Sequence, residues 1–374
     1  MSGIYLDNNA TTEILPEVRQ AMLPFLESAF GNPNSIYELG VQARAAIERS
    51  RHQVAQALGV GASEITFTGS GTEADNQALL GVAFANLTGR KKIVISALEH
   101  SAVKETAKWL GKFGFSTVEV PFVAEQGRVS LAPFSQAIDE ETLLVSVMAA
   151  HNETGILFPL PEIAQHCKKV GALLHSDAIQ AFGKIAFSPE QIGLDMVSIS
   201  AHKCHGPKGV GALWVRRGLK LEALVHGGPQ ENQRRAGTEN VAGIVGFGAA
   251  AALANPEKYK TVSDLRDRFE AELLARFGKR VMINFQDFAR LPQTSSVQFV
   301  GMDGNILLIK LDRAGVFASS GSACHSRSLS VSKSLLAMGL TEKEARGSVR
   351  FSLSPANSTG DIDQTLQILV RLLT

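Results

Sequence analysis

The chain has few cysteines and no excess of charge of either sign. Of its 374 residues, 3 are cysteines, namely Cys167, Cys204 and Cys324, and no C-x-x-C spacing occurs. So few scattered cysteines exclude a disulfide framework, and their odd number raises the question of whether one thiol is reactive. Lys and Arg number 37 against 36 Asp and Glu. The resulting net charge of +1 argues against direct nucleic-acid binding or recruitment to an anionic membrane.

Long hydrophobic runs are missing as well. The longest apolar stretch, residues 241–254, is interrupted by glycine and is shorter than the roughly 18 residues expected of a membrane span. The N-terminus, MSGIYLDNNATT, has no basic segment followed by an apolar run, so we expect no secretory signal and a cytoplasmic location. With 45% hydrophobic and 20% charged residues, the composition is that of a globular protein of two or three domains.

Between about residues 60 and 216, short β-branched runs alternate with helical patterns. The runs that predict strands are ITFT, KKIVIS, STVEV, TLLVSVMAA, ALLHSDA, MVSIS and GALWV. Such alternation predicts an α/β fold with a mostly parallel, seven-stranded sheet and helices on both faces. Ligands of such sheets bind beyond the carboxyl ends of the strands, so polar residues just after these runs are the first candidates for a site.

A smaller α/β domain is expected after residue 254. An Asn-Pro pair and several lysines interrupt the pattern in residues 254–260, as is typical of a domain boundary. Next we expect a helix opened by a capping box of Thr261 and Asp264. It is followed by strands VMINF and TSSVQFV, a helix over residues 304–313 and a strand SVRFSL.

Two candidate residues follow predicted strands. Lys203 lies in the loop SAHKCHGPKG, where partial desolvation would favour the neutral, nucleophilic amine; a solvated surface lysine is the alternative. Asp177 ends the strand ALLHSDA. Its carboxylate could hold a heterocyclic nitrogen protonated, as pyridoxal phosphate requires, or could instead cap the next helix.

The turn TGSGTEADN, after the strand ITFT, places Gly71 and Thr72 at a helix N-terminus. Backbone N–H groups and the helix dipole favour phosphate there, although such a turn alone is weak evidence. Cys324 lies in the polar loop ASSGSACHSRS, close to two cationic residues. An accessible thiolate is therefore favoured over a structural cysteine, whereas Cys167 lies in a helical pattern and is expected to pack.

Three further polar residues complete the candidate set. His100 could stack on a flat ring, Arg350 could bind a carboxylate with two parallel hydrogen bonds, and Asn152 follows a strand in HNETG. The alternatives are a satisfied histidine, a surface-paired arginine and a turn asparagine. The set also includes the amine of Lys203, the carboxylate of Asp177 and the phosphate site after ITFT. Together these groups suit pyridoxal phosphate acting on an amino acid, with the Cys324 thiolate as second reactant.

Nine motifs, taken in order, resemble those of the cysteine desulfurases, the NifS/IscS-like branch of fold-type I pyridoxal-phosphate enzymes. They are YLDNNATT, GTEADN, EHSAV, NETG, HSDAIQAFGK, SAHKCHGPKGVG, RRAGTENV, SSGSAC and VRFSL. The resemblance implies a homodimer that converts L-cysteine to L-alanine and leaves the sulfur as a persulfide on Cys324. It also implies a large domain over 13–254 and a small domain of 1–12 and 255–374, with the catalytic loop at about 318–331.

The resemblance assigns roles to individual residues. The residues expected to bind the cofactor are Lys203, Asp177, Gln180, His100, Gly71, Thr72, Ser200, His202 and Thr238 of the partner subunit. Lys203 would form an imine with the cofactor, Asp177 would pair with its ring nitrogen, and Gln180 would contact its ring hydroxyl. Asn152 and Arg350 would bind the substrate carboxylate, Cys324 would be the nucleophile, and no metal is expected.

Other functions stay open at this point. Selenocysteine lyase, or another class V aminotransferase activity, would use the same scaffold, and a non-catalytic sulfur-relay or scaffold protein is a further alternative. His202, Cys204 and His205 could be taken for metal ligands, but a closed zinc site needs a second pair at suitable spacing. The sulfur acceptor, an iron-sulfur scaffold or a thiolation carrier, is not determined. Relatives usually carry an apolar residue where Cys204 follows Lys203, and we expect this thiol to be buried and inert.

Overall fold

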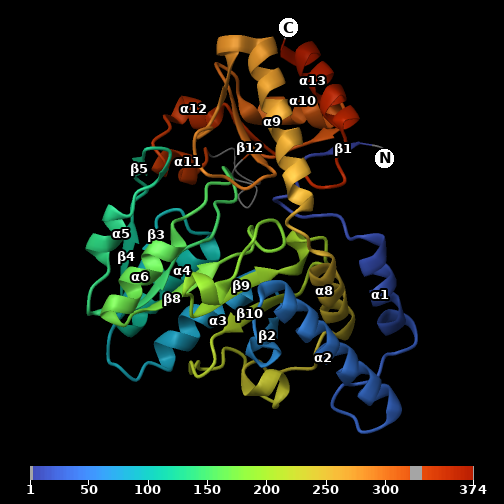
Figure 1. Ribbon diagram of the computed structural model, residues 1–374, viewed down its shortest axis with the longest axis vertical. Coiled ribbons are helices and arrows are strands. Elements are labelled where there is room, and N and C mark those ends of the chain that lie inside the picture. The colour runs from blue at the N-terminus through green and yellow to red at the C-terminus, as the bar shows by residue number, and fades with distance from the viewer. Residues whose placement is uncertain (1–2, 321–330, 374) are drawn as a thin grey trace.

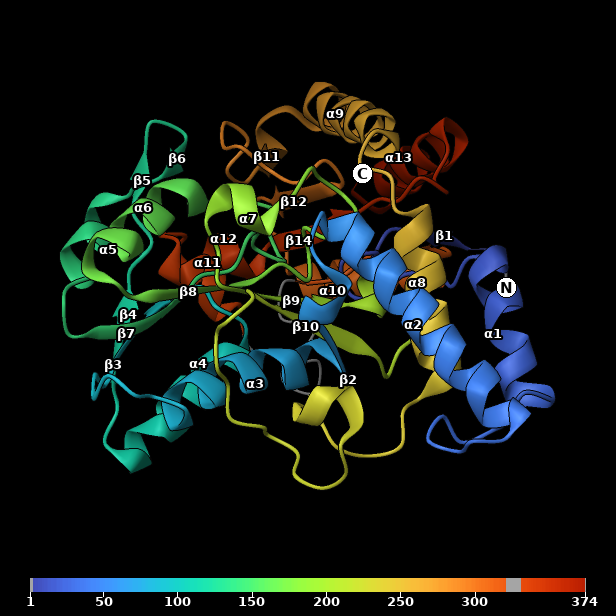
Figure 2. The same cartoon turned by 60° about the horizontal axis from the view of Figure 1, so that its bottom comes forward.

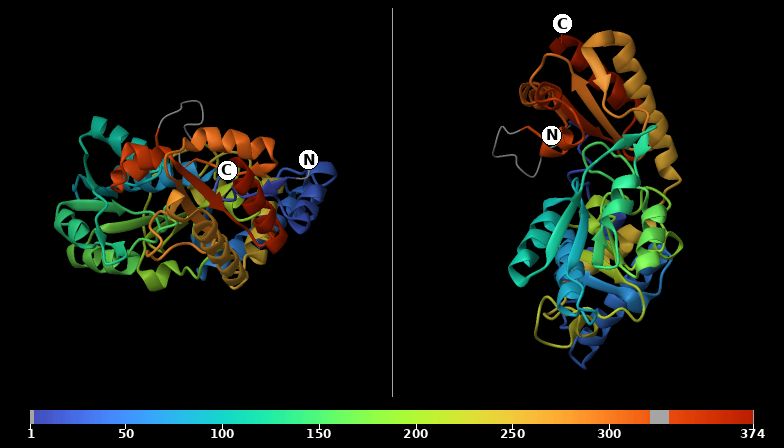
Figure 3. Two further views of the ribbon diagram at one scale, coloured as in Figure 1. Left: turned by 90° about the horizontal axis from the view of Figure 1, so that it is seen from above. Right: turned by 90° about the vertical axis from the view of Figure 1, so that its left-hand side faces the viewer.

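The computed structural model describes residues 3–320 and 331–373. A larger unit contains the seven-stranded sheet, and a smaller unit lies above it along the long axis of the molecule (Figure 1; Figure 3). Every helix in the described part of the chain is too short or too polar to span a lipid bilayer. Cys324 and most of the predicted loop at 318–331 lie outside the described residues.

The seven-stranded sheet has the order β2-β10-β9-β8-β7-β3-β4. β10 runs antiparallel to both of its neighbours, and all other neighbouring strands are parallel. The strands are β2 (Ile65–Thr68), β3 (Lys92–Ser96), β4 (Ser116–Val120), β7 (Thr142–Ser146), β8 (Leu173–Asp177), β9 (Met196–Ser200) and β10 (Gly211–Val215). Each coincides with or lies within a predicted run, so the predicted mostly parallel sheet is confirmed.

Alternate side chains of the sheet pack into two hydrophobic cores. In β3, Ile93 and Ile95 join the core on one face, whereas Val94 joins the core on the other. Helices α3 and α4 cover the first face, and α2, α6 and α8 cover the second (Figure 2). These helices are α2 (Glu38–Leu58), α3 (Gly71–Phe84), α4 (Ser101–Leu110), α6 (Leu160–Val170) and α8 (Val241–Leu253). A sheet buried on both faces explains why its strands read as nearly continuous apolar runs.

The smaller unit has its own core around the antiparallel sheet β11-β12-β14. Its main elements are α9 (Lys258–Phe277), β11 (Val281–Ile283), β12 (Thr294–Phe299), α10 (Gly304–Arg313), β14 (Ser348–Ser352) and α13 (Thr359–Leu373). The N-terminal strand β1 (Ile4–Tyr5) pairs with β13 (Val316–Phe317), so the first described residues belong to this unit. The elements of the chain not yet named, in either unit, are α1 (Pro16–Glu27), β5 (Ala124–Glu125), β6 (Arg128–Val129), α5 (Ala132–Ala137), α7 (Pro189–Ile192), α11 (Lys333–Ala337) and α12 (Glu342–Arg346).

The capping box predicted at Thr261 and Asp264 is wrong, because α9 already begins at Lys258. The side chain of Asn255 accepts a hydrogen bond from the backbone N–H of Glu257 at 2.9 Å, so the Asn-Pro turn starts the helix. The Thr261 hydroxyl instead donates to the carbonyl of Lys258 at 2.8 Å, within the first turn. The hydrogen bond of the Asn255 side chain therefore sets the start of the helix, and Thr261 does not.

A buried ion pair fixes the loop that carries Thr238. Arg51, on α2, donates two hydrogen bonds to Glu231, at 2.6 and 2.8 Å, and a third to the carbonyl of Ile65 at 3.0 Å. Glu231 also accepts a hydrogen bond from the backbone N–H of Phe67 at 2.8 Å. The side chains of Arg51 and Glu231 are 6% and 3% exposed. This pair therefore ties α2 and β2 to the loop.

We predict that Arg51→Met lowers the free energy of unfolding by about 3 kcal/mol or more, because the Glu231 carboxylate loses its buried counter-charge. Urea denaturation measures the change. The double variant R51M/E231Q should recover part of the loss, since it removes the unpaired charge. As a control, Arg276→Met breaks the exposed pair with Glu272 and should cost less than about 1 kcal/mol. Equal losses for both arginines would contradict this account.

Candidate active site

A cavity of about 340 Å³ lies at the carboxyl ends of the sheet strands, under the N-terminal segment. It is lined by ten of the sequence-predicted site residues: Gly71, Thr72, His100, Asn152, Asp177, Gln180, Ser200, His202, Lys203 and Arg350. The fold therefore brings together residues that lie as far apart in the chain as Gly71 and Arg350. Asn9 and Ala10 line the same cavity and were missed by the sequence analysis, although they lie in the motif YLDNNATT.

Neighbouring parallel strands deliver the central residues to this cavity. Asp177 ends β8 and Ser200 ends β9, and the two strands pair in register with Asp177 opposite Ser198. Lys203 follows in the short turn directly after β9. Because parallel strands end at the same edge of a sheet, the carboxyl group, the hydroxyl and the amine converge there.

Lys203 points its amine into the cavity toward the N-terminal segment. Its Nζ donates hydrogen bonds to the carbonyls of Asn9 and Ala10, both at 2.7 Å. Lys203 is half-buried, so the solvated surface lysine considered above does not describe it. His100 lies on the wall of the cavity as the N-cap of α4, where its Nδ1 accepts from the backbone N–H of Ala102 at 3.1 Å. This bond fixes the orientation of the imidazole ring.

Asp177 is a buried carboxyl group whose surroundings shift its pKa in opposite directions. Burial raises its pKa, whereas the backbone N–H of Ile179, at 2.9 Å from its Oδ1, and electrostatic interactions with His100 and Lys203 lower it. A protonated ring nitrogen next to this carboxyl group would favour its ionised form. The Asp177 side chain therefore fits the pyridine nitrogen of pyridoxal phosphate.

Two more buried carboxyl groups lie near Asp177 and were not anticipated from the sequence. Burial is the main cause that raises the pKa values of Asp75 and Glu99 well above their ordinary range, and the nearby Asp177 raises them further. Asp75 Oδ1 is 3.7 Å from Nε2 of His175, but burial lowers the pKa of that histidine to about 3. The imidazole is therefore neutral at pH 7, and the contact is not an ion pair.

The N-terminus of α3 offers a place for an anion. Ser70 caps the helix by accepting from the backbone N–H of Glu73 at 3.1 Å, and in the described part of the chain no hydrogen bond is recorded from the N–H groups of Gly71 and Thr72. A Cβ atom on Gly71 would clash with the end of the Ile179 side chain, which would have to move. Glycine therefore leaves room at this helix start, and the free N–H groups fit a phosphate.

His202 lies at the same end of the cavity. Its pKa is lowered to about 4, first by burial and then by Lys203 and other nearby cations, so its ring is neutral at pH 7. Its Nδ1 is 3.2 Å from the hydroxyl of Thr11. The carbonyl of His202 accepts from the Thr12 backbone N–H at 2.9 Å. This bond anchors the N-terminal segment over the turn that carries His202 and Lys203.

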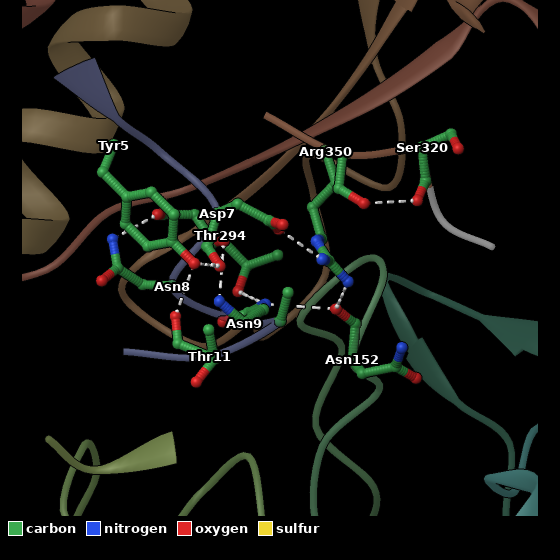
Figure 4. A network of polar contacts seen from close by, with 12 residues as sticks. Tyr5, Asp7, Asn8, Asn9, Thr11, Asn152, Thr294, Ser320 and Arg350 are labelled. Carbon is green, nitrogen blue, oxygen red and sulfur yellow. Dashed lines mark hydrogen bonds and ion pairs between the residues drawn. The ribbon is translucent and has the colours of Figure 1, made fainter. Parts of the chain in front are cut away.

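Arg350 is buried at 2% exposure, so the alternative of a surface-paired arginine is wrong. One guanidinium nitrogen lies 2.6 Å from the carboxylate of Asp7, and another donates to the carbonyl of Asn152 at 3.0 Å (Figure 4). Its Nε is buried and has no hydrogen-bond partner among the described residues. A substrate carboxylate would therefore share this guanidinium with Asp7.

Thr238 is not among the described residues that line the cavity. Thr238 is exposed on the loop that follows Glu231, and Cys324 lies outside the described residues. The segment that contains Cys324 nevertheless begins and ends at anchored positions. Ser319 forms two backbone hydrogen bonds with Arg350, at 2.7 and 3.2 Å, and the hydroxyl of Ser332 donates to Glu153 at 2.6 Å.

The other two thiols are buried, as expected. Burial raises the pKa values of Cys167 and Cys204 to about 12. The Cys204 thiol donates to the carbonyl of Ala201 at 3.3 Å, whereas Nδ1 of His205 contacts the carbonyl of Glu13 at 3.0 Å. The side chains once considered as metal ligands thus have separate protein partners, and the described residues contain no cluster of three or more ligating side chains suited to a metal.

We predict that Asp75→Asn raises the melting temperature of the cofactor-free protein at pH 7.5 by about 2 °C or more. The folded protein holds the proton of Asp75 to a higher pH than the unfolded chain, which releases it above the ordinary pKa of 3.8. Stability of the wild type is therefore lost as pH rises above 3.8 toward the raised pKa, and the advantage of the variant should shrink as pH falls toward 3.8. Thermal unfolding between pH 4.5 and 8 measures this.

Asp139→Asn is the matched control, because the pKa of this exposed carboxyl group is lowered by its hydrogen bond to Lys92. Its stabilising charge is present above the ordinary pKa, so the variant should lose a little stability at pH 7.5. A gain for Asp75→Asn that does not depend on pH would contradict the raised pKa of Asp75.

Comparison with known proteins places this geometry in a family. Residues 4–365 match the model of the aminotransferase class-V family. A cysteine desulfurase of Sinorhizobium fredii is 47% identical, with 99% of this chain and 96% of that protein covered. A solved NifS-like protein has a TM-score of 0.91 at 37% identity, covering 100% of this chain and 99% of that one. A structure of SspA in complex with cysteine has a TM-score of 0.83 at 31% identity, covering 95% and 100%. The chain therefore belongs to the aminotransferase class-V family, among its NifS-like cysteine desulfurases.

Proposed function

We propose that this protein is a pyridoxal-phosphate-dependent cysteine desulfurase that converts L-cysteine to L-alanine and transfers the sulfur to Cys324. The observation that carries the proposal is the convergence of Lys203, Asp177 and Arg350 with the N-terminus of α3 on one cavity. An amine, a buried carboxyl group, a carboxylate-binding guanidinium and an anion site are the groups that this chemistry requires. Family membership supports the same assignment.

The cofactor would be held by residues already placed on the cavity wall. Asp177 would pair with the ring nitrogen and His100 would stack on the ring. The phosphate would meet the N–H groups of Gly71 and Thr72, together with Ser200 and His202. When bound, pyridoxal phosphate supplies an electron sink for the substrate α-carbon.

Lys203, Arg350 and Asn152 would handle the substrate. Arg350 and Asn152 would bind its carboxylate, which orients the α-carbon toward Lys203. The amine of Lys203 would bind the cofactor in the resting enzyme and, once free, would take up the α-proton and return it. Exclusion of water by the buried surroundings of Arg350 would strengthen these contacts.

Sulfur transfer would use the Cys324 thiolate as nucleophile. It attacks the sulfur of the substrate, a sulfur–sulfur bond forms and the carbon–sulfur bond breaks. The electron pair stays with the carbon, which takes up a proton to become the methyl group of alanine, and the persulfide remains on Cys324. The anchoring of Ser319 at Arg350, which lines the cavity, supports this role, and Ser332 is held by Glu153, the neighbour in sequence of Asn152 on the cavity wall.

A homodimer is part of the proposal. Large hydrophobic side chains are exposed in and between α1 and α2, namely Leu26, Phe30, Ile36, Tyr37 and Val41, with exposures from 52% to 97%. A second copy of the chain would cover such a patch. The exposed position of Thr238, away from the cavity of its own subunit, suits a contact with the phosphate in the partner's site.

The persulfide would pass to an acceptor protein, either an iron-sulfur scaffold or a thiolation carrier, in the cytoplasm. The content of three cysteines without a disulfide pattern supports a reducing compartment.

We predict that Cys324→Ala keeps the yellow absorbance of the bound cofactor but loses at least 100-fold in sulfide release from L-cysteine with a thiol reductant, because the sulfur then has no nucleophile. Methylene-blue detection of sulfide measures the loss. Cys167→Ala is the matched control, since this thiol is buried on α6 and should be dispensable. Unimpaired turnover by Cys324→Ala would refute the nucleophile assignment.

Subunit mixing tests Thr238. We predict that Thr238→Ala and Lys203→Ala are each strongly impaired alone, and that mixed dimers of the two variants regain up to half of the wild-type activity per dimer. One site in such a dimer has an intact Lys203 from one subunit and an intact Thr238 from the other. Recovery is measured as alanine production after subunit exchange. If Thr238 served its own subunit, no mixed site would be intact and activity would not recover.

A further inference from the structure

A second lysine lies beside the candidate active site and has no role in the chemistry described above. Lys184 is 2% exposed, which is rare for an amine. Its Nζ donates a hydrogen bond to Oε1 of Gln180 at 3.1 Å, and this amide oxygen is its one recorded hydrogen-bond partner in the described part of the chain. Burying an amine against a neutral amide is unfavourable for stability, so its presence calls for a functional reason.

The chain directs Lys184 inward by a specific turn. After β8, the backbone turns back on itself, and the N–H of Lys184 donates to the carbonyl of Ala181 at 3.1 Å. Gly183 adopts a φ of +75°, and a Cβ atom there would lie 3.0 Å from Cβ of Ala254. A side chain at position 183 would therefore be strained, and glycine is needed to aim the following lysine at Gln180.

The contact of Lys184 decides which way the Gln180 amide faces. Gln180 Nε2 donates to the carbonyl of Asn9 at 2.9 Å, and that carbonyl also accepts from Nζ of Lys203 at 2.7 Å. A protonated lysine has donors only, so a flipped amide would oppose its own N–H groups to those of Lys184 and place two oxygens together at Asn9. The observed orientation is thus favoured at both ends.

We propose that Lys184 is a positioning residue that holds the Gln180 amide with its N–H group on the cavity side, ready to donate to the ring hydroxyl oxygen of the cofactor. The inference deepens the proposed function and rests on it, because the ring hydroxyl is the contact assigned to Gln180. Lys184 itself does not line the cavity.

The surroundings of Lys184 bring the titration of its amine close to neutral pH. Its pKa is lowered to about 7, first by burial, then by Lys203 and Arg350, whereas Cys204 acts in the opposite direction. His202 and His205 also face it, and both lose basicity in part because of its charge. A neutral amine can still donate to Oε1 of Gln180, and the carbonyl of Asn9 favours the same orientation of the amide whatever the charge of Lys184.

A double-mutant cycle tests the proposal on cofactor affinity. The variants are Lys184→Met, Gln180→Ala and their combination, and the probe is pyridoxal phosphate titrated into the cofactor-free protein. We expect K184M alone to weaken binding about five-fold, the effect of one neutral hydrogen bond, but less than two-fold in the Gln180→Ala background. The same loss in both backgrounds, or no loss in either, would overturn the proposal.

Stability of the cofactor-free protein gives a second readout that a merely structural lysine would not show. K184M should be at least as stable as the wild type, because methionine fills similar space without burying an amine. The folded pKa of about 7 lies below the ordinary 10.5, so the advantage of K184M should be full below pH 7 and fade as pH rises toward 10.5. A K184M protein that is less stable at pH 6 yet binds the cofactor normally would assign Lys184 to packing alone.

Two further variants complete the design. Lys184→Gln keeps a donor in the same space and should weaken cofactor binding less than K184M; the reverse order would contradict the proposal. Lys92→Met is the matched control, because this largely buried lysine pairs with Asp139 away from the cavity and should leave the affinity unchanged. If the wild type itself does not bind pyridoxal phosphate, the proposed function fails; if it binds and the cycle is additive, only the role of Lys184 fails.

Discussion

The active site depends on the hydrogen bonds that hold Asn9 between the larger and the smaller unit. This residue is 1% exposed, and its carbonyl accepts hydrogen bonds from Lys203 and Gln180 of the larger unit. Its side chain donates to Thr294, and its backbone N–H donates to Ser352, both in the smaller unit. The N-terminal segment therefore joins the two sheets at the point where the cofactor would bind. Because one residue serves both units, the cavity acquires its geometry only when the smaller unit is folded against the larger one.

That geometry places cations and acids in a setting where burial governs their protonation. On the side of the N-terminal segment, burial and the charge of Lys203 lower the pKa of Lys184; on the side of the sheet, burial raises those of Asp75 and Asp177. Each shift makes the charged form less favourable in the protein alone. A cofactor with a protonated ring nitrogen would favour the ionised form of Asp177, the one of these three groups that lines the cavity.

The sequence predicted the parts of the molecule that depend on local pattern. β-branched runs and apolar periodicity identified the sheet, and residues just after its strands, such as Asp177 and Lys203, were expected at one edge because parallel strands end together. Asn9, Asp75 and Lys184 were not identified, since their importance comes from contacts between segments distant in the chain. Periodicity indicates the face on which a residue lies, but not the partner that it meets there. The start of α9 was missed because the hydrogen bond of the Asn255 side chain sets it, and not the capping-box pattern of Thr261 and Asp264.

The position of Arg350 couples substrate binding to the segment that would carry the sulfur. Its guanidinium contacts Asp7 and Asn152, while its backbone pairs with Ser319, the last but one described residue before that segment. In the proposed function, a substrate carboxylate would compete with Asp7 for the guanidinium, and any resulting shift of β14 would be transmitted through two backbone hydrogen bonds to Ser319. In that proposal, the residue that would bind the substrate carboxylate is therefore also the one that holds Ser319, just before the segment that contains Cys324.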